Sequence, residues 1–240
     1  MTDFIIGLDL GQAQDYAAIA GAEVVPPERR VPMVHPEDVI QPSPGMVRSL
    51  PPRVPSKRTY RVRGLERPPL GTPYPAILER LRELVRDKRL GCTGLVVDAT
   101  GVGPPVVDLL RQAGLHPVAV TITGGDTVTK EDWLTWRVPK RDLASTVKVL
   151  LQSHRLQIAD GLEHGPTLAR ELLNFRAKIN LRTMHDSYEA WREGMHDDLV
   201  LAVAVACWWD GKRRGPLPQV RVRIMRRYAG EATRLLGKLG

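Results

Sequence analysis

Two short apolar segments that each end in an aspartate constrain the fold of this chain most. Residues 4–9 read FIIGLD and residues 94–98 read GLVVD. Each is short and apolar, which is typical of a buried strand. A carboxylate in such a place is unfavourable unless it is paired, hydrogen-bonded or bound to a cation. Asp9 and Asp98 are therefore the first candidates for a functional site, although each alone could be a turn or cap aspartate.

The other elements predict how these two strands are arranged. Residues 16–25 and 57–66 read as two further strands, and from residue 74 helices and strands alternate. The expected helices are 75–89, 104–113, 140–153, 163–175 and 197–209, and the remaining strands are 117–122 and 156–158. This order predicts an α/β fold with a mixed central sheet, a three-stranded antiparallel hairpin part plus parallel strands, flanked by helices. The strands of Asp9 and Asp98 can then be parallel neighbours whose carboxyl ends lie side by side.

A pair of adjacent acids precedes the last predicted helix. Asp197 and Asp198 stand directly before LVLAVAVACWW, which is apolar on nearly every face and should be buried. One aspartate is accounted for as an N-cap favoured by the helix dipole. Successive helical residues point about 100° apart, so one acid can cap while the other faces the sheet. The sequence leaves open which of the two does so.

Carboxylates that converge without basic partners predict a metal site. Their oxygen ligands suit Mg²⁺ or Mn²⁺ rather than Zn²⁺. Two such ions about 4 Å apart form the arrangement used for in-line phosphoryl transfer. Asp9, as the central acid, is expected to bridge the two ions, with Asp98, Asp197 and Asp198 as the other catalytic ligands.

Charge and proline are distributed unevenly. Residues 26–56 contain nine prolines and are interpreted as an insertion in a single domain that spans residues 1–210. The net charge of +8 resides in residues 211–240, which hold nine Lys or Arg against one acid. A basic tail on a neutral domain indicates a polyanion such as DNA, or a solvated tail without a partner. The candidate DNA-binding residues are Lys140, Arg141, Arg213, Arg214, Arg221 and Arg223.

The chain is expected to be soluble. Its longest apolar run, residues 199–209, is 11 residues, against the roughly 20 needed to cross a bilayer. No signal peptide is recognised at the start, so no membrane partner is predicted and the expected location is cytoplasmic, in a bacterial host. Cys92 and Cys207 are predicted to be buried thiols, not a disulfide or zinc site.

Taken in order, several motifs resemble the nuclease domain of phage terminase large subunits. They are DLG with DYAAIA, VVDATGVGPPVVDLL, VPKRDL with QSHRLQIA, LARELLNF and HDDLVLAVAVACWW. The match spans residues 3–210, and HDDLVLA after two strand-end aspartates is its most specific part. The resemblance implies a ribonuclease H-like fold and a DNA endonuclease, with Asp9 and Asp98 as the first and second metal-binding acids and Asp197 or Asp198 in the final position.

One departure from that family is large, because no G-x-x-x-x-G-K-[ST] motif of an ATPase motor is present. The resemblance therefore implies a free-standing or excised nuclease that acts on double-stranded DNA. Its expected partners are a separate packaging ATPase, a small terminase subunit or a portal. Within the nucleases a Holliday-junction resolvase is an alternative, and from other classes an actin- or sugar-kinase-like ATPase or a catalytically silent DNA-binding module.

Overall fold

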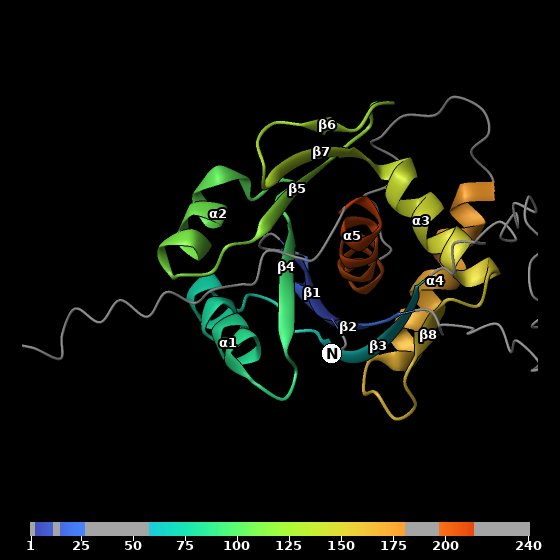
Figure 1. The fold of residues 1–240 in the computed structure, drawn as a ribbon, viewed down its shortest axis with the longest axis horizontal. Coiled ribbons are helices and arrows are strands. Elements are labelled where there is room, and N and C mark those ends of the chain that lie inside the picture. Colours follow the sequence, from blue (N-terminus) through green and yellow to red (C-terminus); the bar gives the residue numbers. More distant parts are fainter. Residues whose placement is uncertain (1–2, 12–14, 27–57, 181–196, 214–240) are drawn as a thin grey trace, which may run out of the picture.

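The described residues form one eight-stranded sheet with helices on both faces (Figure 1). The computed structural model describes residues 3–11, 15–26, 58–180 and 197–213. The strands are β1 (Asp3–Asp9), β2 (Ala18–Val25), β3 (Thr59–Glu66), β4 (Cys92–Asp98), β5 (Val118–Thr123), β6 (Thr129–Lys130), β7 (Thr135–Pro139) and β8 (Leu156–Ile158). The helices are α1 (Tyr74–Arg86), α2 (Gly103–Gln112), α3 (Lys140–Gln152), α4 (Gly165–Asn180) and α5 (Asp198–Lys212). The predicted α/β class and mixed sheet are confirmed.

The strand order, β6-β7-β5-β4-β1-β2-β3-β8, places the two aspartate strands at the centre. β1, β2 and β3 form the predicted antiparallel part, whereas β4, β5 and β7 continue the sheet parallel to β1. In the pairing of β1 with β4, Asp9 lies opposite Asp98. The two carboxyl ends are therefore side by side, as the alternation of strands and helices predicted.

Helices cover β1 and β4 on both faces, which explains why these strands are almost wholly apolar. Figure 1 shows α1 and α2 on one face of the sheet and α3, α4 and α5 on the other. α5 is buried from Asp198 to Asp210. A Cβ added at Gly7 would lie 1.9 Å from the carbonyl oxygen of Ala202. Glycine at this position of β1 therefore allows α5 to pack directly on the sheet.

Some sequence expectations differ from the structure. β6 and β7 were not predicted, and β7 carries Trp136. Its ring packs edge to face against Trp208 and Trp209, with centroids 5.7 and 6.0 Å apart. The TWRVP segment has neither strict alternation nor a long apolar run, so packing against α5 and pairing with β5 define the strand. Trp133 lies outside the helices and strands and is 71% exposed.

The predicted end of the domain at residue 210 and the proline-rich insertion 26–56 both lie near the limits of the described residues. α5 extends to Lys212, two residues beyond the expected end of the domain at residue 210. Of the proline-rich insertion only Pro26 lies inside the described residues, and the tail beyond residue 213 lies outside them.

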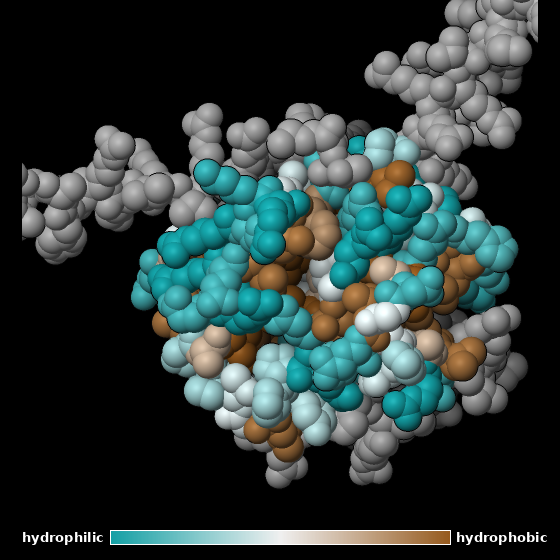
Figure 2. All heavy atoms as spheres, turned by 90° about the horizontal axis from the view of Figure 1, so that it is seen from below, coloured by the Kyte–Doolittle hydropathy of each residue, from teal (hydrophilic) through white to brown (hydrophobic). Residues whose placement is uncertain are grey.

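Most of the described surface in Figure 2 is hydrophilic, and apolar residues show mainly in a hollow near the middle of that face. Within the described ranges, no helix combines the length and the hydropathy that crossing a membrane requires. Cys92 and Cys207 are both free thiols; Cys207 is buried, as predicted, whereas Cys92 is only half-buried.

Candidate functional site

Asp9 and Asp98 form the floor of the candidate site at the ends of β1 and β4. The Asp98 carboxylate is buried and accepts a hydrogen bond from the backbone N–H of Thr100 at 2.8 Å. Asp9 is half-buried, and no hydrogen-bond donor among the described residues reaches its carboxylate. A carboxylate that is withdrawn from water in this way favours its neutral form unless a cation approaches.

The pKa values of the two acids reflect this environment. Burial raises the pKa of Asp9 well above its ordinary value, and repulsion from Asp98, Asp198 and Asp197 raises it further. Burial also raises the pKa of Asp98 to about 6, although the hydrogen bonds from Thr100 act in the opposite direction. The structure therefore places the two carboxylates in a position that is unfavourable for negative charge.

The start of α5 brings Asp197 and Asp198 to the same place. Asp197 is the N-cap residue of α5, but its side chain makes no capping hydrogen bond. Asp198 lies in the first turn and is buried. Capping alone therefore explains neither carboxylate, and both contribute to the repulsion at Asp9.

Two cationic side chains partly compensate these aspartates. Nη2 of Arg67 lies 2.6 Å from Oδ2 of Asp198, and the Arg67 guanidinium stacks 4.1 Å above the centroid of the Tyr16 ring. Nζ of Lys140 lies 3.5 Å from Oδ2 of Asp197. Burial lowers the pKa of Lys140, whereas the negative charges of Asp197, Asp9 and Asp98 act to raise it. Lys140 therefore faces the carboxylates from the start of α3.

A fifth carboxylate, Glu171 of α4, completes the cluster. Its Oε2 accepts a hydrogen bond from the backbone N–H of Val200 at 3.0 Å. Burial raises the pKa of Glu171 to about 7, and repulsion from Asp198 and Asp197 adds to this, while the Val200 hydrogen bond and Arg67 oppose it. Glu171 was missed in the sequence because a glutamate in an amphipathic helix is usually a solvated residue.

Arg67 was also missed, although a signal was present. It follows the third predicted strand directly, and β3 runs parallel to β1, so its end lies at the same edge of the sheet as Asp9. A basic residue that directly follows a strand parallel to β1 is thus placed beside the acids at the strand ends just as another acid would be.

The remaining candidate residues lie in different surroundings. Arg141 is exposed and pairs with Asp126. The side chain of Arg213 is only 5% exposed, and its guanidinium forms ion pairs with Asp210 and Asp3, both at 2.6 Å. Its position inside the domain differs from the free tail residue that was expected. Arg214, Arg221 and Arg223 lie outside the described residues.

The site thus combines five carboxylates with the two cations Arg67 and Lys140. Its donor set consists of carboxylate oxygens, which suit a hard divalent cation. As the side chains stand, no three His, Cys, Asp or Glu residues within the described ranges are grouped closely enough to hold a metal ion. Arg67 is ion-paired with Asp198, and Lys140 with Asp197. A divalent cation would therefore compete with these two side chains for the carboxylates.

The solved structures that are similar to this chain include two terminase nucleases. No family model and no curated protein matches the chain. The crystal structure of the large terminase nuclease from thermophilic phage G20c is 17% identical with a TM-score of 0.49, over 85% of this chain and 81% of that chain. The human cytomegalovirus terminase nuclease domain is 14% identical with a TM-score of 0.40, over 86% and 82% respectively. Both are terminase nucleases, the class that the sequence motifs resembled.

Proposed function

We propose that this chain is a metal-dependent DNA endonuclease that hydrolyses phosphodiester bonds, of the kind that cuts phage DNA during genome packaging. The observation that carries the proposal is the convergence of Asp9, Asp98, Asp197 and Asp198 at one edge of the sheet. Carboxylates whose pKa is raised by burial, as at Asp9 and Asp98, occur where charge must be balanced by a ligand. The motif resemblance supports DNA as the substrate.

The same residues would hold the metal. Of the four aspartates, Asp9 and Asp98 have no cationic side chain in contact among the described residues, so we expect them to be the first ligands of Mg²⁺ or Mn²⁺. Asp197 and Asp198 would complete the set for two ions by giving up Lys140 and Arg67. When bound, two such ions supply an activated water and stabilise the leaving oxygen.

DNA affinity has to come from elsewhere, because the acidic cluster repels phosphates. Arg141 lies on the surface at the start of α3, next to the residue that faces the site. We propose that Arg141 and the tail residues Arg214, Arg221 and Arg223 bind the DNA backbone, with Lys140 reaching the DNA from within the site. Arg213 fits this role least, since its guanidinium is held inside the domain. A packaging ATPase, a small terminase subunit or a portal is the partner that such a nuclease implies.

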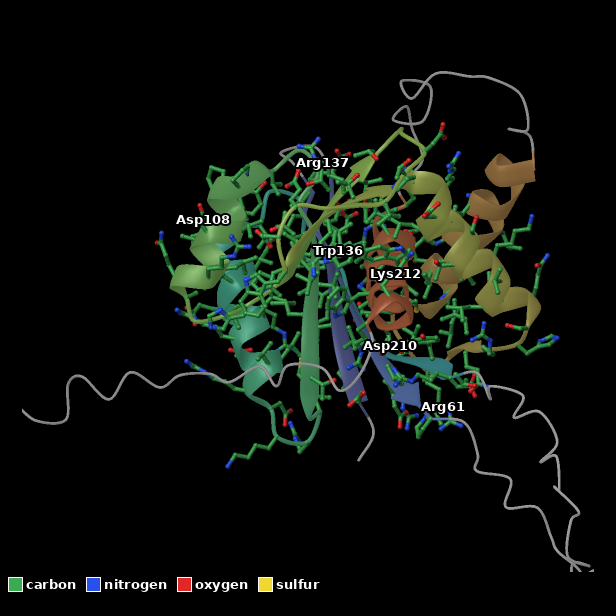
Figure 3. All side chains as sticks on the ribbon, turned by 45° about the horizontal axis from the view of Figure 1, so that its top comes forward. Arg61, Asp108, Trp136, Arg137, Asp210 and Lys212 are labelled. Carbon is green, nitrogen blue, oxygen red and sulfur yellow. The ribbon has the colours of Figure 1, made fainter. Side chains whose placement is uncertain are left out.

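Cleavage of a supercoiled plasmid tests the function directly. We expect nicking with Mn²⁺, none with EDTA, and a loss of at least about a thousandfold in Asp9→Asn and Asp98→Asn, because each removes a metal-ligating charge. Asp108→Asn is the matched control, since Asp108 is exposed on α2 and pairs only weakly with Arg111 at 3.5 Å (Figure 3).

Three results would contradict the proposal. Unchanged nicking by Asp9→Asn would remove the metal site. Turnover of ATP would favour a phosphotransferase, and a strong preference for four-way junctions over duplex would favour a resolvase.

A further inference from the structure

The start of α5 needs a hydrogen-bond acceptor that its own N-cap residue does not supply. The first turn of a helix leaves backbone N–H groups without an intrahelical partner, and an N-cap side chain ordinarily accepts from the second or third of them. Asp197 is the N-cap residue of α5, and its side chain makes no such bond. Val200 is the third residue of α5, so its N–H is the group that Asp197 would ordinarily cap.

The acceptor comes instead from another helix. The N–H of Val200 donates to Oε2 of Glu171 at 3.0 Å, across 29 residues of sequence. We propose that Glu171 is a positioning residue that caps α5 in place of Asp197 and so leaves the Asp197 and Asp198 carboxylates available to the acidic site. This inference rests on the proposed function and identifies how that site is held.

The surroundings of Glu171 are otherwise unfavourable for a glutamate. The residue is 6% exposed, and its Oε1 is buried without a hydrogen-bond partner among the described residues. Asp197 and Asp198 also repel its charge. A buried carboxylate with half of its hydrogen-bonding capacity unused is costly. The bond to Val200 and the dipole at the start of α5 are the interactions that offset this cost.

The cap also explains how two adjacent aspartates serve one site. With Val200 satisfied from α4, Asp198 pairs with Arg67 and Asp197 lies beside Lys140. Without Glu171, Asp197 stands at the N-cap position, from which a side chain usually caps the N–H of the third helical residue, here Val200. Its carboxylate would then turn toward the helix and away from Lys140.

Hydrogen exchange at the Val200 amide, without DNA or metal, tests the cap itself. In Glu171→Ala we expect exchange to be faster by at least about fivefold, the factor that corresponds to an ordinary lost cap. Glu171→Gln should stay within about twofold of wild type, because its side-chain oxygen accepts the same bond. Glu163→Ala is the control, since Glu163 is exposed just before α4.

Metal binding, measured by the rise in Tm with Mn²⁺, tests the consequence for the site. Glu171→Ala should need about tenfold more Mn²⁺ for half of the rise, since Asp197 is diverted, and Glu171→Gln should respond like wild type. Unchanged exchange at Val200 in Glu171→Ala, or a Glu171→Gln variant as impaired as Glu171→Ala, would overturn the proposal.

These measurements distinguish loss of the cap from misfolding of a variant and from failure of the proposed nuclease function. If Glu171→Ala does not fold, Glu171→Gln alone decides, because a changed Val200 exchange rate or Mn²⁺ response in that folded variant contradicts a capping role. The exchange measurement needs no cleavage. A chain in which Asp9→Asn leaves cleavage unchanged would therefore refute the nuclease while leaving the cap intact.

Discussion

The carboxylates at the two ends of α5 differ in the number of hydrogen-bond donors that surround them. At its final turn the Asp210 side chain is 0% exposed and is surrounded by donors. It accepts hydrogen bonds from Nη1 of Arg58 at 2.8 and 3.0 Å, from the Tyr60 hydroxyl at 2.9 Å and from Nε of Arg213 at 2.6 Å. Figure 3 shows Asp210 at the foot of the helix, near the strand that carries Arg61. One acid there meets three donor side chains.

Around the first turn the balance is reversed, because Asp197 and Asp198 lie close to Asp9, Asp98 and Glu171 of other elements, and these five carboxylates are accompanied by only two cations, Arg67 and Lys140. A buried acid with a full set of donors contributes to the integrity of the fold, and its loss leaves the donors unpaired. A group of buried acids with too few donors is instead a place that a cation can stabilise. The difference teaches that burial of a carboxylate does not by itself mark function, whereas its supply of donors does.

The largest effect on stability is expected at the final turn of α5, where Asp210 is surrounded by hydrogen-bond donors. Asp210→Ala should lower the free energy of unfolding by about 3–5 kcal/mol, the usual consequence of removing one partner from a buried ion pair. Arg213 and Tyr60 would lose their shared acceptor. Urea unfolding measures the change, with the exposed Asp108→Ala as control. A loss below about 1 kcal/mol would show that this end of α5 is not the anchor that its contacts indicate.

The carboxylates near the first turn of α5, which have few hydrogen-bond donors, should make the free energy of unfolding depend on pH. The pKa of Asp98 is about 6 in the folded protein, above its ordinary value of 3.8. Its contribution is therefore fully present below the ordinary pKa and is lost as the pH rises through about 6, and Asp9 acts in the same direction. At about 1.4 kcal/mol per pKa unit, this loss is about 3 kcal/mol.

Urea unfolding in EDTA between pH 4 and 8 measures that loss. Asp98→Asn should flatten the dependence, because the amide does not titrate. Millimolar Mn²⁺ should restore stability at pH 7 in the wild type, since binding to the folded state alone stabilises it. Equal pH dependence in wild type and variant would mean that burial does not destabilise the Asp98 carboxylate in the folded protein.

The smallest expected effect on stability concerns Arg213, which directly follows the last turn of α5. A chain ended after Lys212 should be less stable than one ended after Arg213 by about 2 kcal/mol, since only the latter keeps the charged hydrogen bonds to Asp210 and Asp3. Thermal unfolding of the two chains measures the difference. Equal stability of the two chains would mean that the hydrogen bonds of Arg213 to Asp210 and Asp3 do not stabilise the fold.

The chain ended after Arg213 also tests the tail in DNA binding. Each phosphate contact that the tail makes with duplex DNA adds about 0.9 to the slope of affinity against salt on logarithmic axes. We expect the shortened chain to have a flatter slope than the full chain and to retain Mn²⁺-dependent nicking at low salt. An identical slope would assign DNA binding to Arg141 and the domain instead.

Much of the architecture follows from local sequence patterns. The apolar segments at 4–9 and 94–98 could only be stable when buried, and the helices between the later strands made those strands parallel. The neighbouring positions of Asp9 and Asp98 follow from this alone. β6 and β7 did not, because Thr129–Lys130 is too short for a periodic pattern and Trp136 is on a strand only through its neighbours.

The chain sequence by itself determined the class of fold, the strand-end aspartates and the acidic pair before a buried helix, because periodicity and charge are local properties. Tertiary structure alone decided what surrounds those acids. Glu171 lies on α4, Lys140 on α3, and Arg67 directly after β3, and their contacts with the start of α5 span 29, 57 and 131 residues respectively. Electrostatic balance depends on distance in space, which sequence spacing does not encode, so the same residue type supports the fold at Asp210 and forms the candidate site at Asp198.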